Sequence, residues 1–191
     1  PLRELGGALA NQGDVDVQAL AGAISTGTHG TGPTLGSLSS RVTGLRFVTA
    51  RGDIVSWDAR SDGESMEAAR VSLGLFGVIT AIRLALVPPY RLHERVWHEP
   101  IESCLAELDD RIASTRHFEF FWWPHSDEAE MKTLDPTTAP PSDVEGRPGE
   151  RIDWSSIIFP SVRDLRFNEM EYAVAAQHGP ACVLAVRERM R

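Results

Sequence analysis

Apolar residues recur along the chain with two different periods, and each period predicts one type of element. Where they recur every three or four positions, the spacing predicts amphipathic helices. The predicted helices cover residues 2–13, 17–24, 64–71, 101–113 and 178–190. Where they recur at every second position, or form short β-branched runs, they predict strands. The predicted strands cover residues 42–57 as a hairpin, 78–87, 90–99, 118–123 and 166–174.

Two stretches interrupt this series of predicted helices and strands. Pro88 and Pro89 end the mostly buried strand predicted at 78–87, because proline lacks the donor that a strand interior needs. We therefore predict the main internal boundary there. Residues 126–151 are polar and rich in proline, so we expect no regular structure in them, only a disordered loop or a place where residues are missing.

Small and hydroxylated residues dominate the run AGAISTGTHGTGPTLG, in which Gly22, Gly27, Gly30, Gly32 and Gly36 fall within fifteen positions. Glycine lets a backbone approach a ligand closely, and its N–H groups can form an anion-binding nest. A mobile loop would have the same composition, so both interpretations stay open. The run lacks the lysine of a P-loop and the G-x-G-x-x-G spacing of a Rossmann site.

Composition narrows the class of protein. The 191 residues, 42% of them hydrophobic, fit one large domain or two small ones, with no apolar run long enough for a membrane span and no signal peptide. We therefore expect a cytoplasmic protein. A net charge of −8 argues against nucleic acid as a partner. The six histidines show no metal-ligand spacing, and we expect Cys104 and Cys182 to be buried free thiols.

The aromatic run at residues 118–123 carries much of the apolar surface of the second half. We interpret most of it as core, because buried rings contribute strongly to stability. The alternative is that one of its alternate faces lines a pocket.

Three motifs, in this order, resemble a known family: GDVDVQALAGAISTGTHGTG, AARVSLGLFGVITAIRLALVP and FNEMEYAV. The chain is similar to the aldonolactone oxidoreductase branch of the vanillyl-alcohol-oxidase (VAO) type of FAD flavoproteins, which includes gulonolactone oxidase, arabinonolactone oxidase and alditol oxidase. The resemblance implies an α+β fold. Residues 1–88 would be the second subdomain of a PCMH-type FAD-binding domain, and residues 89–191 part of an α+β cap, or substrate, domain.

The resemblance also implies a set of cofactor-binding residues. The segment Gly27, Thr28, His29 and Gly30 would contact FAD through backbone amides and hydroxyls. Ala19, Ile24 and Ser25 would lie near it, and Ile79 would meet it through its backbone. A Gly30→Val change is then expected to abolish flavin binding with little loss of fold.

Other roles are assigned by the same resemblance. The histidine that carries covalent FAD in many members would lie upstream, so His29 is expected to order its loop by hydrogen bonding. The Glu-x-Arg pair that holds the substrate in relatives would lie beyond the last motif, and the catalytic residues are expected outside this chain. Glu169 and Glu171, on one face of the last predicted strand, are weak substrate candidates. Since the chain starts at Pro1 within a helical pattern, we expect missing upstream sequence.

The expected function is that of a fragment of an FAD-dependent oxidoreductase acting on a sugar lactone or a polyol, inactive by itself. Two alternatives remain: a non-catalytic module that keeps the flavoprotein fold, and a phosphate-binding domain unrelated to flavin.

Overall fold

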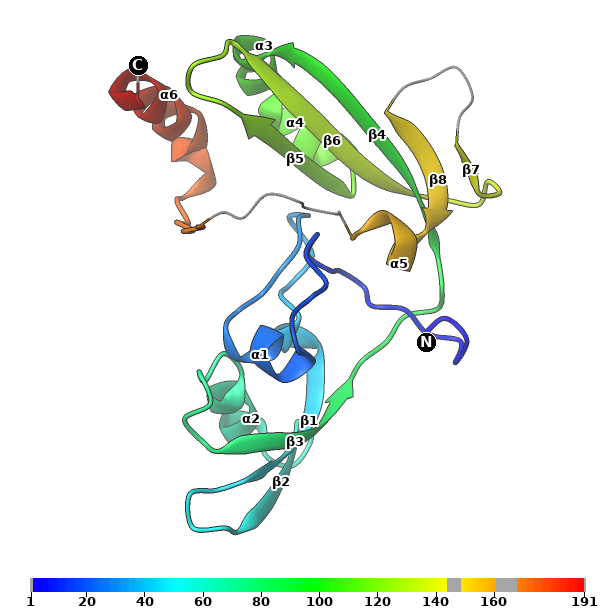
Figure 1. Ribbon diagram of the computed structural model, residues 1–191, viewed down its shortest axis with the longest axis vertical. Helices are drawn as coiled ribbons and strands as arrows, with labels where there is room; N and C mark the ends of the chain where they lie inside the picture. Colours follow the sequence, from blue (N-terminus) through cyan, green and yellow to red (C-terminus); the bar gives the residue numbers. More distant parts are fainter. Residues whose placement is uncertain (1, 144–148, 161–167, 191) are drawn as a thin grey trace. The chain divides into compact units, whose positions relative to one another are not determined.

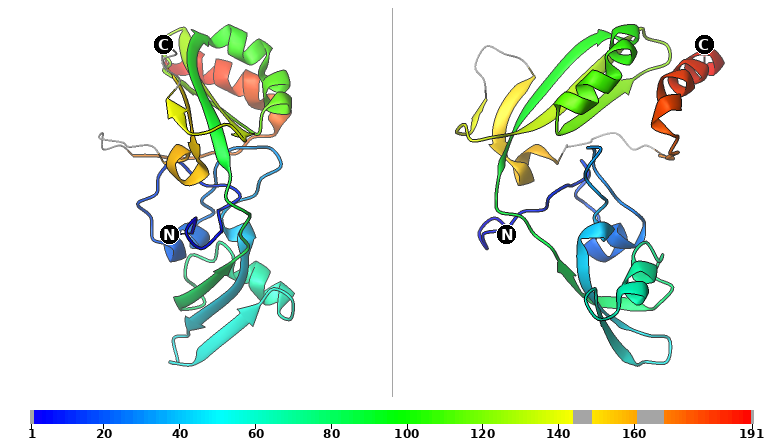
Figure 2. Two further views of the ribbon diagram at one scale, coloured as in Figure 1. Left: turned by 90° about the vertical axis from the view of Figure 1, so that its right-hand side faces the viewer. Right: turned by 180° about the vertical axis from the view of Figure 1, so that it is seen from behind.

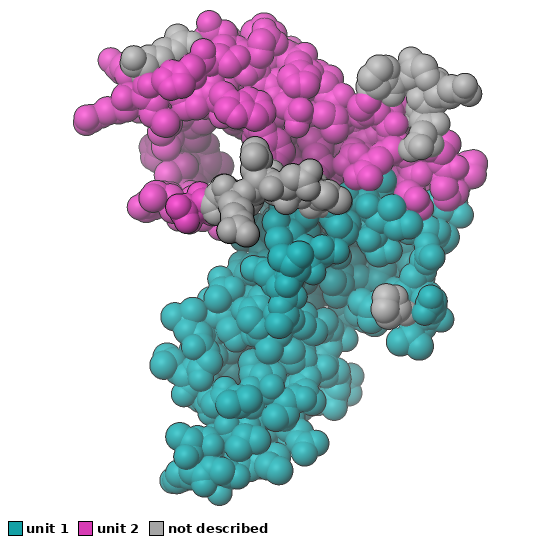
Figure 3. All heavy atoms as spheres, viewed as in Figure 1, with its two compact units in different colours: residues 1–91, 154–161 teal, residues 92–153, 162–191 magenta. Residues whose placement is uncertain are grey.

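The structure is a computed structural model that describes residues 2–143, 149–160 and 168–190. The chain divides into two compact units, one made of residues 1–91 with 154–161 and the other of residues 92–153 with 162–191 (Figure 3). Both contain helices and antiparallel strands, so the α+β class is confirmed (Figure 1). The chain enters the second unit just beyond the predicted boundary and returns to the first at Trp154, a return that the sequence did not indicate.

A three-stranded antiparallel sheet forms the centre of the first unit, in the order β2-β1-β3 (Figure 1). The predicted hairpin is confirmed as β1 (Val42–Val48) and β2 (Ile54–Asp58), and β3 (Val78–Leu84) pairs with the other side of β1. Helices α1 (Leu20–Ser25) and α2 (Gly63–Ala69) lie close to their predicted positions, and a short 3-10 turn, η1 (Ser39–Arg41), leads into β1.

The core of this unit is built from apolar residues of α1, α2 and β1. Its buried members are Ala23, Ile24, Leu38, Val42, Leu45, Phe47, Met66 and Ala69. Phe47 also contacts Trp57 edge to face, with ring centroids 4.7 Å apart. Burial of this set stabilises the element that holds the glycine-rich run, since α1 contributes Ala23 and Ile24 directly.

Two predictions for the first unit are wrong. Residues 2–6 form turns in place of a helix, and Ala8 pairs with Val87 in an isolated bridge. Gly6, at φ +76°, ends any helical path there. Strand β3 is not mostly buried, because it is an edge strand of the sheet and alternates between half-buried and exposed residues.

The second unit contains a five-stranded sheet in the order β5-β6-β4-β8-β7. Its strands are β4 (Arg91–Pro100), β5 (His117–Trp122), β6 (Glu128–Thr137), β7 (Ser142–Asp143) and β8 (Glu150–Trp154). Helices α3 (Ile101–Ala106) and α4 (Leu108–Ser114) lie over one face of this sheet (Figure 2). They replace the single helix predicted at 101–113, which breaks at Glu107.

The core between these helices and the sheet consists of Ile101, Cys104, Ala129 and Met131. Phe118, Phe120 and Trp122 pack against it, which confirms the interpretation of the aromatic run as mainly core, whereas Trp123 is exposed. The chain continues through α5 (Ser155–Ile158) in the first unit and a 3-10 turn, η2 (Ala176–His178), to α6 (Gly179–Met190), close to the predicted final helix.

Two predictions for the second half are also wrong. Residues 128–137 form β6 although the segment was expected to be irregular, because Ala129 and Met131 alternate with polar residues and are fully buried. Residues 168–175 form no strand, and Met170 and Tyr172 are exposed. No neighbouring strand pairs with this segment, and a lone strand is unstable in water. The rest of that predicted strand, residues 166–167, lies outside the described residues.

The buried hydroxyl of Thr133, on β6, has no hydrogen-bond partner among the described residues, although Thr133 is only 2% exposed. We predict that Thr133→Val raises the free energy of unfolding by about 1 kcal/mol, because it removes an unsatisfied polar group and keeps the shape. Urea unfolding would measure this gain. Thr137→Val is the control on the same strand, since the Thr137 hydroxyl accepts a bond from the Ala139 amide. A loss of stability for Thr133→Val would contradict the prediction.

Candidate functional site

The glycine-rich run begins inside α1, whose last residues are buried. Ile24 is 2% exposed and belongs to the core, and Ser25 is 8% exposed. The Ser25 hydroxyl donates to the carbonyl oxygen of Ala21 at 2.7 Å, so it is already engaged within the helix. These two residues therefore position the loop that follows them.

Helix α1 ends in a Schellman arrangement. Gly27 takes a left-handed conformation at φ +76°, and the Thr28 amide donates back to the carbonyl of Ala23 at 3.3 Å. The Thr28 carbonyl then accepts from the Leu38 amide at 2.9 Å, which ties the loop to the start of η1. Glycine is favoured at position 27 because a side chain there would be strained.

Gly30 lies against the N-terminal segment of the chain. A Cβ at this position would come within 2.3 Å of the Gln12 carbonyl oxygen and 2.5 Å of Asn11 Oδ1. Asn11 is buried, and its side-chain amide donates to the carbonyl of Thr31 at 3.1 Å. These contacts fix the loop on one side, so the interpretation of the run as a mobile loop is not supported. They also correct the expectation that Gly30→Val would leave the fold nearly intact.

A second segment, which sequence reasoning missed, holds the other side of the run. The amides of Val71 and Leu73 donate to the carbonyls of Ile24 and Ser25, each at 3.0 Å. Val71 and Leu73 have φ values of +56° and +54°, which cost residues with a Cβ about 1 to 3 kcal/mol each. The hydrogen bonds compensate part of this strain. The sequence carries no glycine at either position that could have indicated the conformation.

The loop exposes polar groups without a titratable carboxylate or amine. Thr28 Oγ1 donates to Gln18 Oε1 at 3.2 Å, and Thr26 Oγ1 donates to the Gly22 carbonyl at 3.2 Å. His29 is exposed, and its Nδ1 lies 2.8 Å from the carbonyl oxygen of Gly30, consistent with a histidine that orders the loop. Such a surface can bind a polar ligand through backbone groups and hydroxyls, whereas it offers no carboxylate for acid–base chemistry.

The structure brings most of the predicted cofactor residues together. Ile24, Ser25, Gly27, Thr28, His29 and Gly30 form one continuous turn at the end of α1. Ala19 precedes α1 as its exposed N-cap residue. Ile79 lies on β3 opposite Phe47, where it packs against the core that contains Ile24.

The structure does not support the two substrate candidates. Glu169 and Glu171 are exposed and do not share a strand face, because no strand forms there.

The expectation of two buried thiols is half correct. Cys104 is buried, and burial raises the pKa of its thiol to about 11, whereas Cys182 is exposed on α6.

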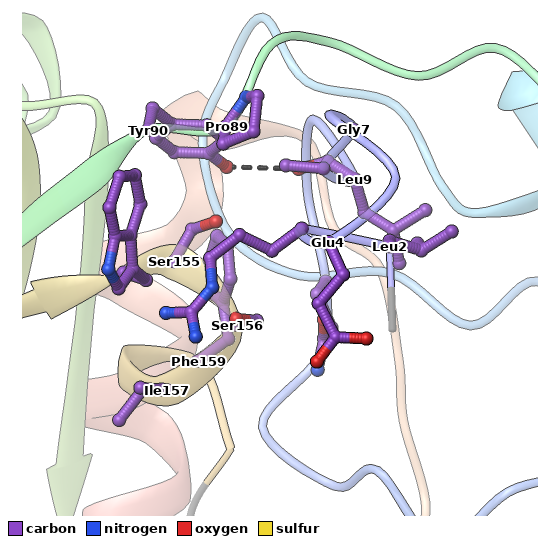
Figure 4. A pocket seen from close by; sticks show the side chains of 14 residues that line it. Leu2, Glu4, Gly7, Leu9, Pro89, Tyr90, Ser155, Ser156, Ile157 and Phe159 are labelled. Atoms are coloured by element: carbon purple, nitrogen blue, oxygen red, sulfur yellow. Dashed lines mark hydrogen bonds between the residues drawn. The ribbon is translucent and has the colours of Figure 1, made fainter.

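A cavity of about 280 Å³ lies within the first unit, between the N-terminal turns, Tyr90 and α5 (Figure 4). The Tyr90 hydroxyl donates to the Leu9 carbonyl at 3.1 Å on one wall (Figure 4). On another wall the guanidinium of Arg3 lies 5.3 Å from the ring centroid of Trp154, and Arg91 lies 4.6 Å from the same centroid. These contacts fasten residues 154–161 to the unit that carries the glycine-rich run.

Glu99, on β4, accepts hydrogen bonds from Trp97 Nε1 at 2.9 Å and from both terminal nitrogens of Arg111. Burial raises the pKa of Glu99, but the bonds from Arg111 and Trp97 outweigh it and hold the pKa below its ordinary value of 4.5. A lowered folded-state pKa adds stability above the unfolded-state pKa, and this stability is lost as the pH falls through the folded-state value.

We therefore predict that Glu99→Gln lowers the free energy of unfolding by about 2 kcal/mol at pH 7 and makes its decline in acid shallower than in the parent chain. Urea unfolding between pH 7 and pH values well below 4.5 measures both effects. Asp109→Asn, an exposed change on α4, is the control. Parallel pH curves for the parent and Glu99→Gln would contradict the prediction.

In the described part of the chain, no helix is long and apolar enough to cross a membrane. Among the same residues, no group of three or more histidine, cysteine or acidic side chains is arranged to hold a metal ion.

Comparison with known proteins relates the chain to one enzyme family. Residues 82–151 match the family model of D-arabinono-1,4-lactone oxidase. The chain is 33% identical to L-gulono-1,4-lactone dehydrogenase of Mycobacterium tuberculosis, over 99% of this chain and 52% of the relative. It is 37% identical to L-gulonolactone oxidase of Bos taurus, over 71% of this chain and 31% of the relative. The chain thus spans about half the length of these relatives, or less.

The fold is similar to that of solved structures of cholesterol oxidase. Cholesterol oxidase from Brevibacterium sterolicum superposes with a TM-score of 0.64 and 22% identity, over 73% of this chain and 30% of the other. At this identity the similarity concerns the fold. It confirms the α+β architecture expected from the sequence.

Proposed function

The chain belongs to the aldonolactone oxidoreductase branch of the flavoproteins, and on this premise we propose that it forms part of an FAD-dependent enzyme that oxidises a sugar lactone or a related polyol. The relatives that support the substrate class are named for gulonolactone and arabinonolactone. In the proposed domain assignment, residues 1–88 belong to the FAD-binding domain and residues 89–191 to the cap domain.

The observation that carries the proposal is the glycine-rich turn after α1, held in one conformation from two sides. Asn11 and Gln12 pack against Gly30, and the amides of Val71 and Leu73 cap the end of α1. A turn that is already held in one conformation can bind a ligand through its backbone without further loss of backbone entropy. This suits the phosphate and ribityl oxygens of FAD, which need donors at close range.

The proposed division of labour follows from the groups present. Bound FAD would supply the redox chemistry by accepting a hydride from a substrate C–H bond. Residues 27–30 would bind and orient the cofactor, and His29 would keep the loop ordered through its bond to the Gly30 carbonyl. Since this loop offers no carboxylate or amine, we propose that the groups that handle the substrate proton lie elsewhere in the enzyme. The 191 residues alone are then expected not to turn over lactone.

Cofactor binding tests the proposal directly. The protein is titrated with FAD, and binding is followed by the visible absorption and fluorescence of the flavin. The expected result is saturable binding that ADP displaces only weakly, since ADP lacks the isoalloxazine ring. Equal affinity for FAD and ADP would favour a general phosphate-binding domain. Failure of this chain and of a longer protein containing it to bind FAD would refute the flavoprotein proposal.

Activity is tested in a protein that matches the full length of the relatives. L-gulono-1,4-lactone is supplied, and oxygen consumption and reduction of an artificial electron acceptor are measured in parallel. Consumption of lactone by either route supports the proposal, and the ratio of the two rates separates an oxidase from a dehydrogenase. A flavin-loaded protein that oxidises neither lactones nor alditols would favour a non-catalytic module.

A further inference from the structure

Four charged side chains form a row across the five-stranded sheet of the second unit. Glu119, Lys132, Glu94 and Arg151 come from β5, β6, β4 and β8, which are neighbours in that order (Figure 1). Their charges therefore alternate from strand to strand. We call this set the charge row.

The members of the charge row contact one another in sequence. Lys132 Nζ lies 3.0 Å from Glu119 Oε1 and 3.9 Å from Glu94 Oε1. Arg151 binds Glu94 through two nitrogens, with Nη2 at 3.2 Å from Oε1. Since Lys132 is opposite Glu119 in the strand register, all four side chains lie on one face of the sheet.

This face is the one opposite α3 and α4, because residues alternate between the faces of a strand. Met131, beside Lys132 on β6, packs with Ile101 and Cys104 of α3 on the helix-covered face. Leu134 shares the face of Lys132 and is 4% exposed. The charge row therefore lies next to a buried apolar position.

Stability alone does not account for charges in this place. The side chains of Lys132 and Glu94 are each only 9% exposed, and Lys132 is the single lysine of the chain. Taking paired charges out of water costs about as much as their attraction returns, so apolar residues would serve stability equally well.

The charge row also has hydrogen-bonding capacity to spare. An ammonium group has three donors, and among the described residues only Glu119 lies within hydrogen-bond distance of Lys132 Nζ. Glu119 contacts Lys132 through Oε1, and its side chain is 27% exposed, which leaves Oε2 without an ion pair to any described residue. A donor and an acceptor therefore lie side by side on neighbouring strands.

A second row on the same face is open to solvent. His98 Nε2 lies 3.3 Å from Glu130 Oε2, and their side chains are 61% and 35% exposed. Phe121 lies opposite Glu130 in the strand register and is half-buried. We define these three residues together with the charge row as the charged face.

We propose that the charged face binds the hydroxyl groups of a polyhydroxylated ligand, namely the sugar lactone or polyol of the proposed function, on which this inference rests. Carboxylates accept from hydroxyl groups and the ammonium donates to them, so acceptors and a donor on neighbouring strands can bind several hydroxyls of one ligand. The ring of Phe121 offers an apolar surface for the C–H bonds of the same ligand.

The single lysine allows a test that needs neither FAD nor turnover. The protein is treated with a limiting amount of acetic anhydride, and mass spectrometry compares acetylation at Lys132 with acetylation at the N-terminal amine. The probe is L-gulono-1,4-lactone, and γ-butyrolactone, which has the ring without the hydroxyls, is the matched control. At about three times its Kd the hydroxylated lactone should slow acetylation of Lys132 about fourfold, in proportion to 1 + [L]/Kd. The control should have no effect.

Variants identify the residues that bind. Glu119→Gln with Glu130→Gln removes two charges and keeps the side-chain shapes, and we expect it to weaken lactone binding about tenfold. Asp109→Asn on α4, which does not belong to the charged face, should leave binding unchanged. Circular dichroism of each variant verifies that the fold is retained.

The outcomes separate this inference from the proposed function. Equal effects of the two lactones, or no protection of Lys132 by either, would overturn the charged-face proposal even if FAD binds. Protection by gulonolactone in a protein that fails to bind FAD would keep the charged face and refute the flavoprotein proposal. Protection that survives unchanged in the double variant would also overturn the inference.

Discussion

Replacing Gly30 by alanine should lower the free energy of unfolding of the first unit by about 3 kcal/mol and weaken any ligand that binds the glycine-rich turn. The added Cβ would meet the Gln12 carbonyl at 2.3 Å and Asn11 Oδ1 at 2.5 Å. Since a carbonyl of the main chain cannot rotate away as a side chain can, the N-terminal segment must move. Asn11 would then lose its bond to the Thr31 carbonyl.

Gly22→Ala is the matched control, because Gly22 lies in α1, eight residues earlier, and a Cβ there meets nothing within 4 Å. This variant should be neutral or gain up to about 1 kcal/mol from helix propensity. Urea unfolding of both variants measures the difference, and FAD titration measures binding. If Gly30→Ala is as stable as Gly22→Ala, the close packing of the turn against residues 11–12 is wrong.

Replacing Gly77 by alanine should cost about 4 kcal/mol, since two penalties combine at this position. Gly77 has φ +133°, a conformation that residues with a Cβ rarely adopt, and a Cβ would lie 2.1 Å from the Val48 carbonyl oxygen. Gly77 immediately precedes β3, which pairs with β1 through Val48 and Val78. The register of β3, and with it the position of Ile79, would shift.

Gly74→Ala separates the two penalties. Gly74 also has a positive φ, of +78°, but a Cβ there meets nothing within 4 Å. It should cost about 1 kcal/mol, the strain of a left-handed residue alone. Hydrogen exchange of the β3 amides would show faster exchange in Gly77→Ala than in Gly74→Ala. Similar exchange in the two variants would contradict the role of the Val48 contact.

Local signals in the sequence predicted the elements whose partners are close in the chain. The β1–β2 hairpin follows from alternation around Arg51 and Gly52, and α2 from the spacing of Met66 and Ala69, both buried against the same core. The strand β6 was missed because its many polar residues and its proline hide the alternation of apolar and polar positions. Its polar residues suggested a loop, although residues 129 and 131–134 are buried.

The candidate site was only partly predictable, because its fixing contacts come from residues that are distant in the sequence. The glycine spacing marked the turn itself, but the contacts that fix it come from residues 11–12 and 71–73, which are distant in sequence. Val71 and Leu73 adopt left-handed conformations that their residue types disfavour, so no local pattern could indicate them. The charge row also depends on pairing between strands, and only the register of the sheet brings Lys132 beside Glu119.

The return of residues 154–161 to the first unit constrains the order in which the protein can fold during synthesis. The Ser155 amide donates to the Tyr90 carbonyl, and Trp154 lies against Arg3 and Arg91. The ribosome makes these late residues only after β4, β5 and β6 have been translated. The first unit therefore cannot be completed until most of the second unit has been translated.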